Sequence, residues 1–284
     1  MIIMSNNQWK CDHNAPAWEH RGEDCSAEAR VGGLVRAYRQ IVPDVLGIQE
    51  ASVPMNRLLM EQMTAFEKDG QPVHYELITG GDTPLLYRDD RLLLIESGFF
   101  RYSESIPGFD GSFNNQGTKS YAFGVFEEKA SGKCFAVMTT HLWWKSSNPE
   151  NADYQANSDE ARAYQIRLAL GRLEKVMEQY ECPGFLVGDL NAVMDSPCLK
   201  AAGEMGWMDA HDAAHGLRDD TRGHHPCGPH GYQRVEKGEF AQAIDHILIP
   251  QNSGVTIGDY LRIDEPWFDC ISDHYPLYIS FEFA

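Results

Sequence analysis

Five places in the sequence share one arrangement, in which a short apolar run carries an acid, an amide or a histidine at or beside its end. They are Ile48-Gln49-Glu50, Thr140-His141, Gly188-Asp189-Leu190-Asn191, the Asp245-His246 pair within AIDHILI, and Ser272-Asp273-His274. A charged group beside a core strand is costly unless it is paired, hydrogen-bonded or bound to a metal. One such group is explained by a structural ion pair. Five of them, with few Lys or Arg adjacent, predict a shared centre that holds a cation.

The ligand types indicate which cation and which chemistry. Carboxylate oxygens suit hard ions such as Mg²⁺ or Mn²⁺, whereas Zn²⁺ sites favour His and Cys. Magnesium takes few protein carboxylates, keeps several waters and binds the phosphate groups of substrates. Carboxylates with two or three histidines therefore predict metal-assisted hydrolysis of a phosphate ester. The metal would polarise a phosphoryl oxygen, an aspartate would align a water, and a histidine would stabilise the developing charge.

The elements that must position these residues are short strands alternating with helices along the whole chain. Apolar spacing predicts helices over 24–42, 55–68 and 158–180, with Ser158 as an N-cap, and a helix starting at Ser196-Pro197. Strands are predicted within 2–4, 43–50, 73–79, 85–88, 92–97, 121–127, 134–140, 185–191, 243–249, 255–261 and 275–283. Residues 209–240, rich in His, Gly and Asp, are predicted to form a long loop. Because no repeat, linker or composition break interrupts this order, residues 1–284 predict one α/β domain with much antiparallel or mixed sheet.

Five segments in this order resemble the endonuclease/exonuclease/phosphatase superfamily. They are PDVLGIQE, FAVMTTHL, FLVGDLNA, QAIDHILI and SDHYPLYISF, which run from residue 43 to residue 281. Each segment alone is a weak signal, but five in family order cover nearly the whole chain. The resemblance implies a deoxyribonuclease-I-like fold, an α/β four-layer sandwich of two mixed, largely antiparallel β-sheets flanked by helices.

The resemblance also implies a metal centre. Glu50 would be the main metal ligand, and Asn7, at the end of the first strand, would lie near the metal. Asn6 is the alternative if the register of that strand differs by one residue. Asp273 would support the metal.

The catalytic residues follow from the same resemblance. Asp189 would align or deprotonate the attacking water, and Asn191 would help to position the water and the phosphate. His141 would contact a phosphate oxygen, and Asp245 would buttress His274, the second phosphate-binding histidine. His246 has no assigned role.

Several further residues are candidates for substrate binding. Arg162 and Gln165 resemble an Arg-x-x-Gln pattern of the family, and Lys119 stands where members often have an Arg. A lysine is a point charge and cannot grip a phosphate in the bidentate way of an arginine. Trp143, next to Trp144 and Lys145, would either stack on a substrate or pack under a loop.

The histidine-rich segment GHHPCGPHGY, which includes His225 and His230, precedes the strand that carries Asp245. Three interpretations stay open for it: a loop that faces the substrate, a solvated loop, or a second metal site. It lacks a clean Cys/His ligand spacing for zinc.

The charge balance restricts the partners. The chain has 42 Asp and Glu against 24 Lys and Arg, a formal net charge of −18. Long nucleic acids are disfavoured, because binding to a phosphate backbone depends on Lys and Arg. The seven cysteines are scattered and MIIMSNNQWK has too short an apolar stretch for a signal peptide, so a cytoplasmic protein with free thiols is expected. No apolar run is long enough to span a membrane.

These observations predict a divalent-metal-dependent hydrolase of phosphate esters, a phosphodiesterase or phosphatase. A water aligned by Asp189 would attack a phosphate bound to the metal, and a small or single-phosphate substrate is favoured. The first alternative is a nuclease that acts on DNA or RNA. The second is a non-catalytic binding module with the same fold. The sequence does not indicate an oligomeric state.

Overall fold

The protein is built on two stacked six-stranded β-sheets. The computed structural model describes residues 1–10, 24–219 and 243–284. The first sheet has the order β13 (Val255–Arg262), β14 (Leu277–Phe283), β1 (Ile2–Asn7), β2 (Val45–Gln49), β6 (Leu85–Tyr87) and β5 (Glu76–Ile78). The second has the order β11 (Trp207–Asp209), β12 (Asp245–Pro250), β10 (Gly184–Asp189), β9 (Cys134–His141), β8 (Ser120–Glu128) and β7 (Leu92–Arg101). A small hairpin joins β3 (Ala65–Lys68) to β4 (Gln71–His74).

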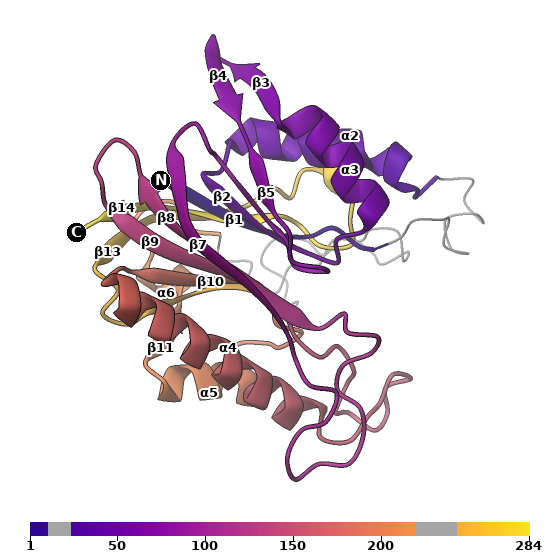
Figure 1. The fold of residues 1–284 in the computed structure, drawn as a ribbon. Coiled ribbons are helices and arrows are strands. Elements are labelled where there is room, and N and C mark those ends of the chain that lie inside the picture. The colour runs from indigo at the N-terminus through magenta and orange to yellow at the C-terminus, as the bar shows by residue number, and fades with distance from the viewer. Residues whose placement is uncertain (11–23, 220–242) are drawn as a thin grey trace.

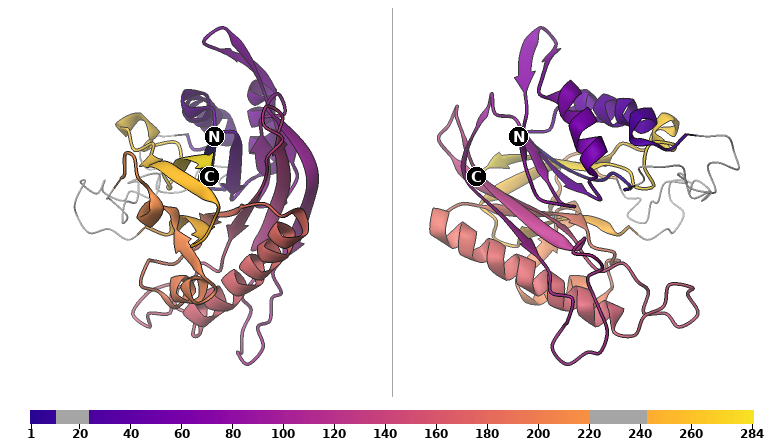
Figure 2. Two further views of the ribbon diagram at one scale, coloured as in Figure 1. Left: turned by 90° about the vertical axis from the view of Figure 1, so that its left-hand side faces the viewer. Right: turned by 45° about the vertical axis from the view of Figure 1, so that its right-hand side comes forward.

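Helices cover both outer faces, so the molecule has four layers, as the sequence predicts (Figures 1 and 2). Helices α2 (Ala27–Ile41) and α3 (Val53–Met63) lie on the first sheet, and α4 (Ser158–Tyr180) and α5 (Pro197–Glu204) lie on the second. The short helix α6 (Ala210–Ala213) and the 3-10 turn η1 (Pro266–Phe268) complete the described elements. None of the helices in the described residues is both long and apolar enough to cross a membrane.

Alternating side chains on the central strands build three separate apolar layers. Ile3 and Val45 point between the sheets, whereas their neighbours Met4 and Leu46 point toward α2 and α3. Val137 of β9 points between the sheets, and the adjacent Met138 points toward α4. The nearly continuous apolar runs of these strands are therefore explained by burial on both faces.

The sheets approach closely where β2 crosses β9 and β10. A Cβ on Gly47 would lie 2.4 Å from Cγ2 of Val187 and 2.9 Å from Cβ of Thr139. Gln49, two residues further on, is fully buried and donates to Oγ1 of Thr139 at 2.9 Å. This contact fixes the end of β2 against β9, next to the strand ends that carry the polar residues.

Several local predictions were wrong in detail. The helix predicted over 55–68 ends at Met63, and β3 follows at once, where Phe66 stacks on Tyr75 of the returning chain. Ser158 is the first residue of α4 and not its cap, since Asn157 occupies the cap position. The loop predicted from residue 209 begins later, because β11 ends at Asp209 and α6 follows it.

Candidate active site

The register of the strands brings the predicted residues together at one edge. His141 at the end of β9 lies opposite Asp189 of β10, and Asp189 lies opposite Asp245 of β12. In the other sheet, Asn7 ends β1 and pairs with Gln49, so that Glu50 follows at the same edge. Parallel pairing of β1 with β2 and of β9 with β10 is the cause, because parallel strands end on the same side.

The chain leaves three of these strands in a strained conformation. Trp9, Glu50 and Asn191 have φ of 54°, 55° and 48°, in the left-handed region that a residue with a side chain adopts at a cost of about 1–2 kcal/mol. Each follows β1, β2 or β10 within two residues. Such strain concentrates at functional sites, because the surrounding structure must hold it in place.

Asp189 lies at the centre of the cluster and is only 2% exposed. Its Oδ2 accepts from Nδ2 of Asn7 at 3.0 Å, and its Oδ1 accepts from the backbone N–H of Asn191 at 2.8 Å. Nδ2 of Asn7 also lies 3.3 Å from Oε1 of Glu50, so one amide links the two carboxylates. Asn6 instead contacts Tyr38 and the backbone of His274, which resolves the register in favour of Asn7.

Among the residues that the structure describes, two groups of side chains offer ligand atoms within 4.8 Å of one another. They are Glu50, His141 and Asp189, and Asp189, Asp245 and His274. Carboxylate oxygens dominate the combined set, which fits a hard divalent cation such as Mg²⁺ or Mn²⁺. Asn7 presents its amide nitrogen to the carboxylates, while its oxygen accepts from the N–H of Trp9 at 2.9 Å. In this orientation Asn7 positions the carboxylates and does not offer an oxygen ligand.

His274 lies between two carboxylates. Its Nδ1 is 2.7 Å from Oδ2 of Asp245, and its Nε2 is 3.9 Å from Oδ2 of Asp189. Burial alone would lower the pKa of His274, but the charges of Asp245 and Asp189 and the Asp245 hydrogen bond outweigh it, and the pKa lies well above its usual value. Asp273 is the more distant neighbour, 4.0 Å from Nε2. His274 is therefore an imidazolium at neutral pH.

The same environment shifts Asp189. Burial is the largest effect, and it raises the pKa of Asp189 to about 6, although the charges of His274 and Lys119 oppose it. A carboxyl whose pKa is close to neutrality can take a proton in one step and release it afterwards.

His141 and Lys119 form a second polar pair, on the other side of Asp189. Both are buried, and Nζ of Lys119 is 2.5 Å from Nε2 of His141. Burial and the Lys119 charge hold the pKa of His141 well below its usual value, and burial lowers the pKa of Lys119 against the pull of Glu50 and Asp189. The imidazole is therefore neutral, and Lys119 is the cation of the pair.

Three residues at the site have no signal in the sequence. The backbone N–H of Lys10 donates to Oε2 of Glu50 at 3.0 Å, and Nζ of Lys10 pairs with Asp82 at 2.8 Å. Arg30 of α2 donates to the carbonyls of Cys25, Gln8, Trp9 and Ile271, and so ties α2 to the chain after β1 and to the segment before His274. Asp82 lies in the turn GGDTP, for which the composition predicts only a bend.

Two residues predicted to bind substrate, Trp143 and Arg162, are buried and contact other parts of the protein instead. Trp143 was expected near the mouth of the site, but its side chain is 0% exposed and packs edge-on against Phe113. Arg162 is 5% exposed, donates to the carbonyls of Trp143 and Lys145, and pairs with Asp159. Gln165 likewise bonds to backbone groups of Trp143 and Phe113. These residues hold the chain after β9 against α4.

The other residues predicted to bind substrate lie at the surface or outside the described residues. Trp144 is 41% exposed, and Lys145 Nζ lies 5.8 Å from its ring centroid. His225 and His230 lie outside the described residues, as do the other residues of GHHPCGPHGY.

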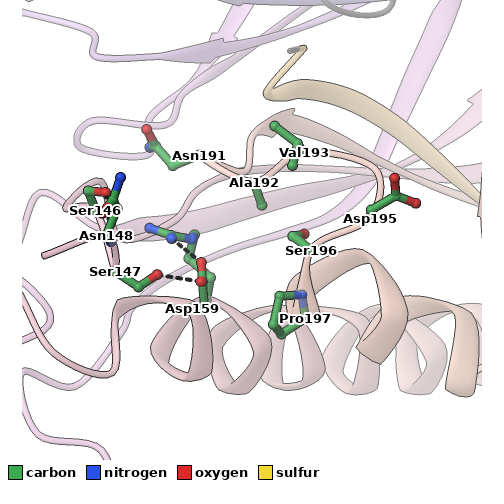
Figure 3. A pocket seen from close by; sticks show the side chains of 11 residues that line it. Ser146, Ser147, Asn148, Asp159, Asn191, Ala192, Val193, Asp195, Ser196 and Pro197 are labelled. Carbon is green, nitrogen blue, oxygen red and sulfur yellow. Dashed lines mark hydrogen bonds and ion pairs between the residues drawn. The ribbon is translucent and has the colours of Figure 1, made fainter. Parts of the chain in front are cut away.

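A pocket with polar and apolar walls adjoins the cluster on the Asn191 side (Figure 3). Its volume is about 550 Å³, and it lies between the chain after β9, the first turn of α4 and the loop from β10 to α5. Asn191 lines it, as do Ser146, Ser147, Asn148 and Asp195. Figure 3 shows Ser147 bonded to Asp159 at the floor of this pocket.

Comparisons of the fold give a consistent result, although no protein-family model and no curated protein sequence matches the chain. An endonuclease/exonuclease/phosphatase family protein from Bacteroides thetaiotaomicron aligns with a TM-score of 0.74 at 16% identity, over 100% of this chain and 98% of that one. A mannosyl-6-phosphatase from the same species aligns with a TM-score of 0.73 at 17% identity, over 100% of both chains. TDP2 from D. rerio, complexed with a single-strand DNA product, aligns with a TM-score of 0.64 at 18% identity, over 99% of this chain and 98% of that one.

The chain has the endonuclease/exonuclease/phosphatase fold. These similarities cover the whole chain and include both sheets, so the four-layer architecture predicted from the motifs is confirmed. Identities below 20% carry no further information about substrate, because one fold supports many functions. What the protein does must be argued from the cluster around Asp189.

Proposed function

We propose that the protein is a divalent-metal-dependent hydrolase of phosphate esters that acts on a small or single-phosphate substrate. The observation that carries the proposal is the convergence on Asp189 of Asn7, His141, His274 and the Asn191 backbone, with Glu50 linked to it through Asn7. Ordinary salt bridging does not explain two candidate ligand groups that share one buried carboxylate.

Glu50 and Asp189 would hold the cation, with His141 in the same group, while Asp245 and His274 belong to the adjoining group that shares Asp189. A bound divalent cation would supply a Lewis acid that polarises a phosphoryl oxygen. Lys10 and Asn7 hold the two oxygens of Glu50 in a fixed orientation. A carboxylate that rotates freely loses conformational entropy when a cation binds. Because Glu50 is already restrained, this cost is smaller and cation binding is favoured.

Asp189 would accept the proton of the attacking water. The water oxygen would form a bond to phosphorus, and the bond from phosphorus to the alcohol oxygen would break. The leaving oxygen would take up the proton that Asp189 releases, so that the carboxylate is restored. The pKa of Asp189, about 6, leaves the carboxylate ionised at neutral pH and basic enough for this transfer.

The cations around Asp189 would stabilise the phosphate as negative charge builds on its oxygens. His274 is held as an imidazolium by Asp245, and the Lys119–His141 pair lies on the other side. Hydrogen-bond donors that are fixed before the reaction stabilise the transition state without reorganising. The hydrogen bond that Nδ1 of His274 donates to Oδ2 of Asp245 fixes the orientation of the ring.

The substrate class is narrowed by charge. The mannosyl-6-phosphatase and the TDP2 complex with single-strand DNA have the same fold, so both a phosphorylated sugar and a nucleic acid are candidates by analogy. A net charge of −18 disfavours a long polyanion. Nuclease activity is therefore the alternative, and the assay must distinguish it from hydrolysis of small phosphate esters.

The test is hydrolysis of para-nitrophenyl phosphate, its diester and single-stranded DNA with Mg²⁺ or Mn²⁺, and again with chelator. We expect phosphate release that chelator stops, and a loss of about 10²–10⁴-fold in kcat for Asp189→Asn and for Glu50→Gln. Asp69→Asn and Glu67→Gln make the same chemical changes on the exposed β3–β4 hairpin and serve as matched controls. Undiminished activity of Asp189→Asn, or turnover in chelator, contradicts the proposal, and a strong preference for DNA supports the alternative.

A further inference from the structure

The pocket beside Asn191 is contiguous with the proposed reaction centre. The backbone N–H of Asn191 donates to Oδ1 of Asp189, and its side chain lines the pocket. A group esterified to a phosphate at Asp189 can therefore extend past Asn191 into this space. The volume of about 550 Å³ lies within the range of about 300–1,000 Å³ that is usual for sites of small ligands.

The pocket has both polar and apolar walls, and it offers no unpaired positive charge among its described lining residues. Arg162 is its cation, and that guanidinium is already bound by Asp159 and by two backbone carbonyls. Asp195 adds a negative charge, and the described lining contains no lysine and no aromatic ring. A second phosphate would find no counter-charge here, and a nucleobase would find no ring on which to stack.

Several polar groups in the pocket are available to a ligand. The amide nitrogen of Asn148, the amide oxygen of Asn191 and the carboxylate of Asp195 make no hydrogen bond within the described residues. Ser146 lies beside Asn148, and its hydroxyl oxygen accepts from the backbone N–H of Asn148 at 3.1 Å (Figure 3). Neutral hydroxyl groups can both donate to and accept from such a lining.

We propose that this pocket binds the uncharged, hydroxyl-rich alcohol part of a phosphate monoester, a sugar or a cyclitol, while the single phosphate lies at Asp189. This inference rests on the proposed function and names its substrate class. Discrimination comes from the lack of a free cation in the described lining as well as from the hydroxyl contacts, because specificity includes rejection of competing ligands.

The first test compares inositol monophosphate, inositol bisphosphate and para-nitrophenyl phosphate as substrates with Mg²⁺. The wild-type protein should have a higher kcat/KM for inositol monophosphate than for the bisphosphate. Asn148→Ala should raise the KM for inositol monophosphate about fivefold to tenfold with little change in kcat, since it removes one hydrogen-bond donor to the ligand. The KM for para-nitrophenyl phosphate should rise less.

Asn151→Ala is the matched control. Asn148 and Asn151 lie on the same loop, and each accepts through Oδ1 from the N–H two residues on, at 3.0 Å and 2.8 Å. Only Asn148 lines the pocket. Asn151→Ala should therefore leave all three KM values at their wild-type levels. The inference is overturned if Asn148→Ala and Asn151→Ala behave alike, or if the bisphosphate is the better substrate.

A second measurement separates this inference from the proposed function. Phosphate-free myo-inositol should bind weakly, at millimolar concentration, as saturation-transfer NMR would detect. Binding should persist in Glu50→Gln and in Asn151→Ala and weaken in Asn148→Ala. No binding to the wild-type protein overturns the pocket assignment even if phosphate esters are hydrolysed. Binding without any hydrolysis instead overturns the proposed function alone.

Discussion

His246 provides the sharpest test of how the loop after β10 is held. Its Nδ1 lies 2.8 Å from Oδ2 of Asp209, and its Nε2 lies 2.7 Å from the carbonyl oxygen of Ala192. The His246 hydrogen bond and its charge hold the pKa of Asp209 below its usual value against the effect of burial, so Asp209 is a carboxylate. A carboxylate and a carbonyl oxygen only accept, so His246 satisfies both partners by donating from each ring nitrogen.

The change to make is His246→Leu. It leaves a buried carboxylate without its main partner, which costs about 3–5 kcal/mol. The entropy of unfolding is about 2.1 cal/mol/K per residue, or about 0.6 kcal/mol/K for 284 residues, so Tm should fall by about 5–8 °C. His74→Leu, on the exposed strand β4, is the matched control and should change stability by less than about 0.5 kcal/mol.

A double-mutant cycle with Asp209→Asn isolates the charge pair. The asparagine oxygen can still accept from the N–H of His211, as Oδ1 of Asp209 does at 2.8 Å, so the cap of α6 is kept. In this background His246→Leu should cost only about 1–2 kcal/mol, for the lost bond to Ala192. Additive effects, within about 0.5 kcal/mol by urea unfolding, would refute the ion-pair interpretation. The double variant should be more stable than His246→Leu alone. It should not regain full activity, because the carbonyl of Ala192, which follows Asp189 and Asn191, still lacks its hydrogen bond from position 246.

Three further perturbations have definite expected outcomes. Gly188→Ala should lower Tm by more than about 5 °C, since Gly188 has φ of +155° and an added Cβ would lie 2.0 Å from a backbone oxygen of β9; normal stability would contradict this. The raised pKa of His274 stabilises the fold at pH below its unfolded value, and that stability is lost as the pH rises through the folded pKa. In metal-free protein, ring NMR should therefore find His274 protonated at neutral pH, and Asp245→Asn should move its titration to lower pH. Arg30→Met should cost about 3–5 kcal/mol by chemical unfolding, because four carbonyls lose a charged donor, whereas the same change at the exposed Arg57 should cost less than about 1 kcal/mol.

The strand ends could be predicted from the sequence because their signal is local. An apolar run followed by an acid or a histidine marks both the strand and the functional side chain, and Asp189 and His141 lie where this pattern puts them. The fold followed from the order of five such segments.

Residues whose partners lie far along the chain gave no such signal. Lys10 and Asp82 are 72 positions apart, and nothing in either segment indicates that they pair. The sequence left two interpretations open for Trp143, and the structure supports packing under a loop. A tryptophan after Thr140-His141-Leu142 has the same local pattern whether it faces solvent or packs on Phe113. Whether a side chain on a loop is buried depends on the elements that pack against the loop, here α4. The sequence of the loop alone does not indicate which element that is.

The local charge of the site explains how an acidic protein can favour a single phosphate. Among the described residues, five carboxylates gather there, from Glu50, Asp82, Asp189, Asp245 and Asp273. Three described cations face them, Lys10, Lys119 and the imidazolium of His274, while His141 is neutral. The charges of these described groups sum to −2, which one divalent cation would bring to zero. Lys119 and His274 would then remain as positive charges near an incoming phosphate. A second phosphate would meet Asp195 in the pocket, where Arg162 is already paired with Asp159, or an acidic surface, since the whole chain carries −18. Selectivity for one phosphate would thus follow from the positions of the buried cations. A lysine introduced at the rim of the pocket should therefore allow substrates with a second phosphate to bind.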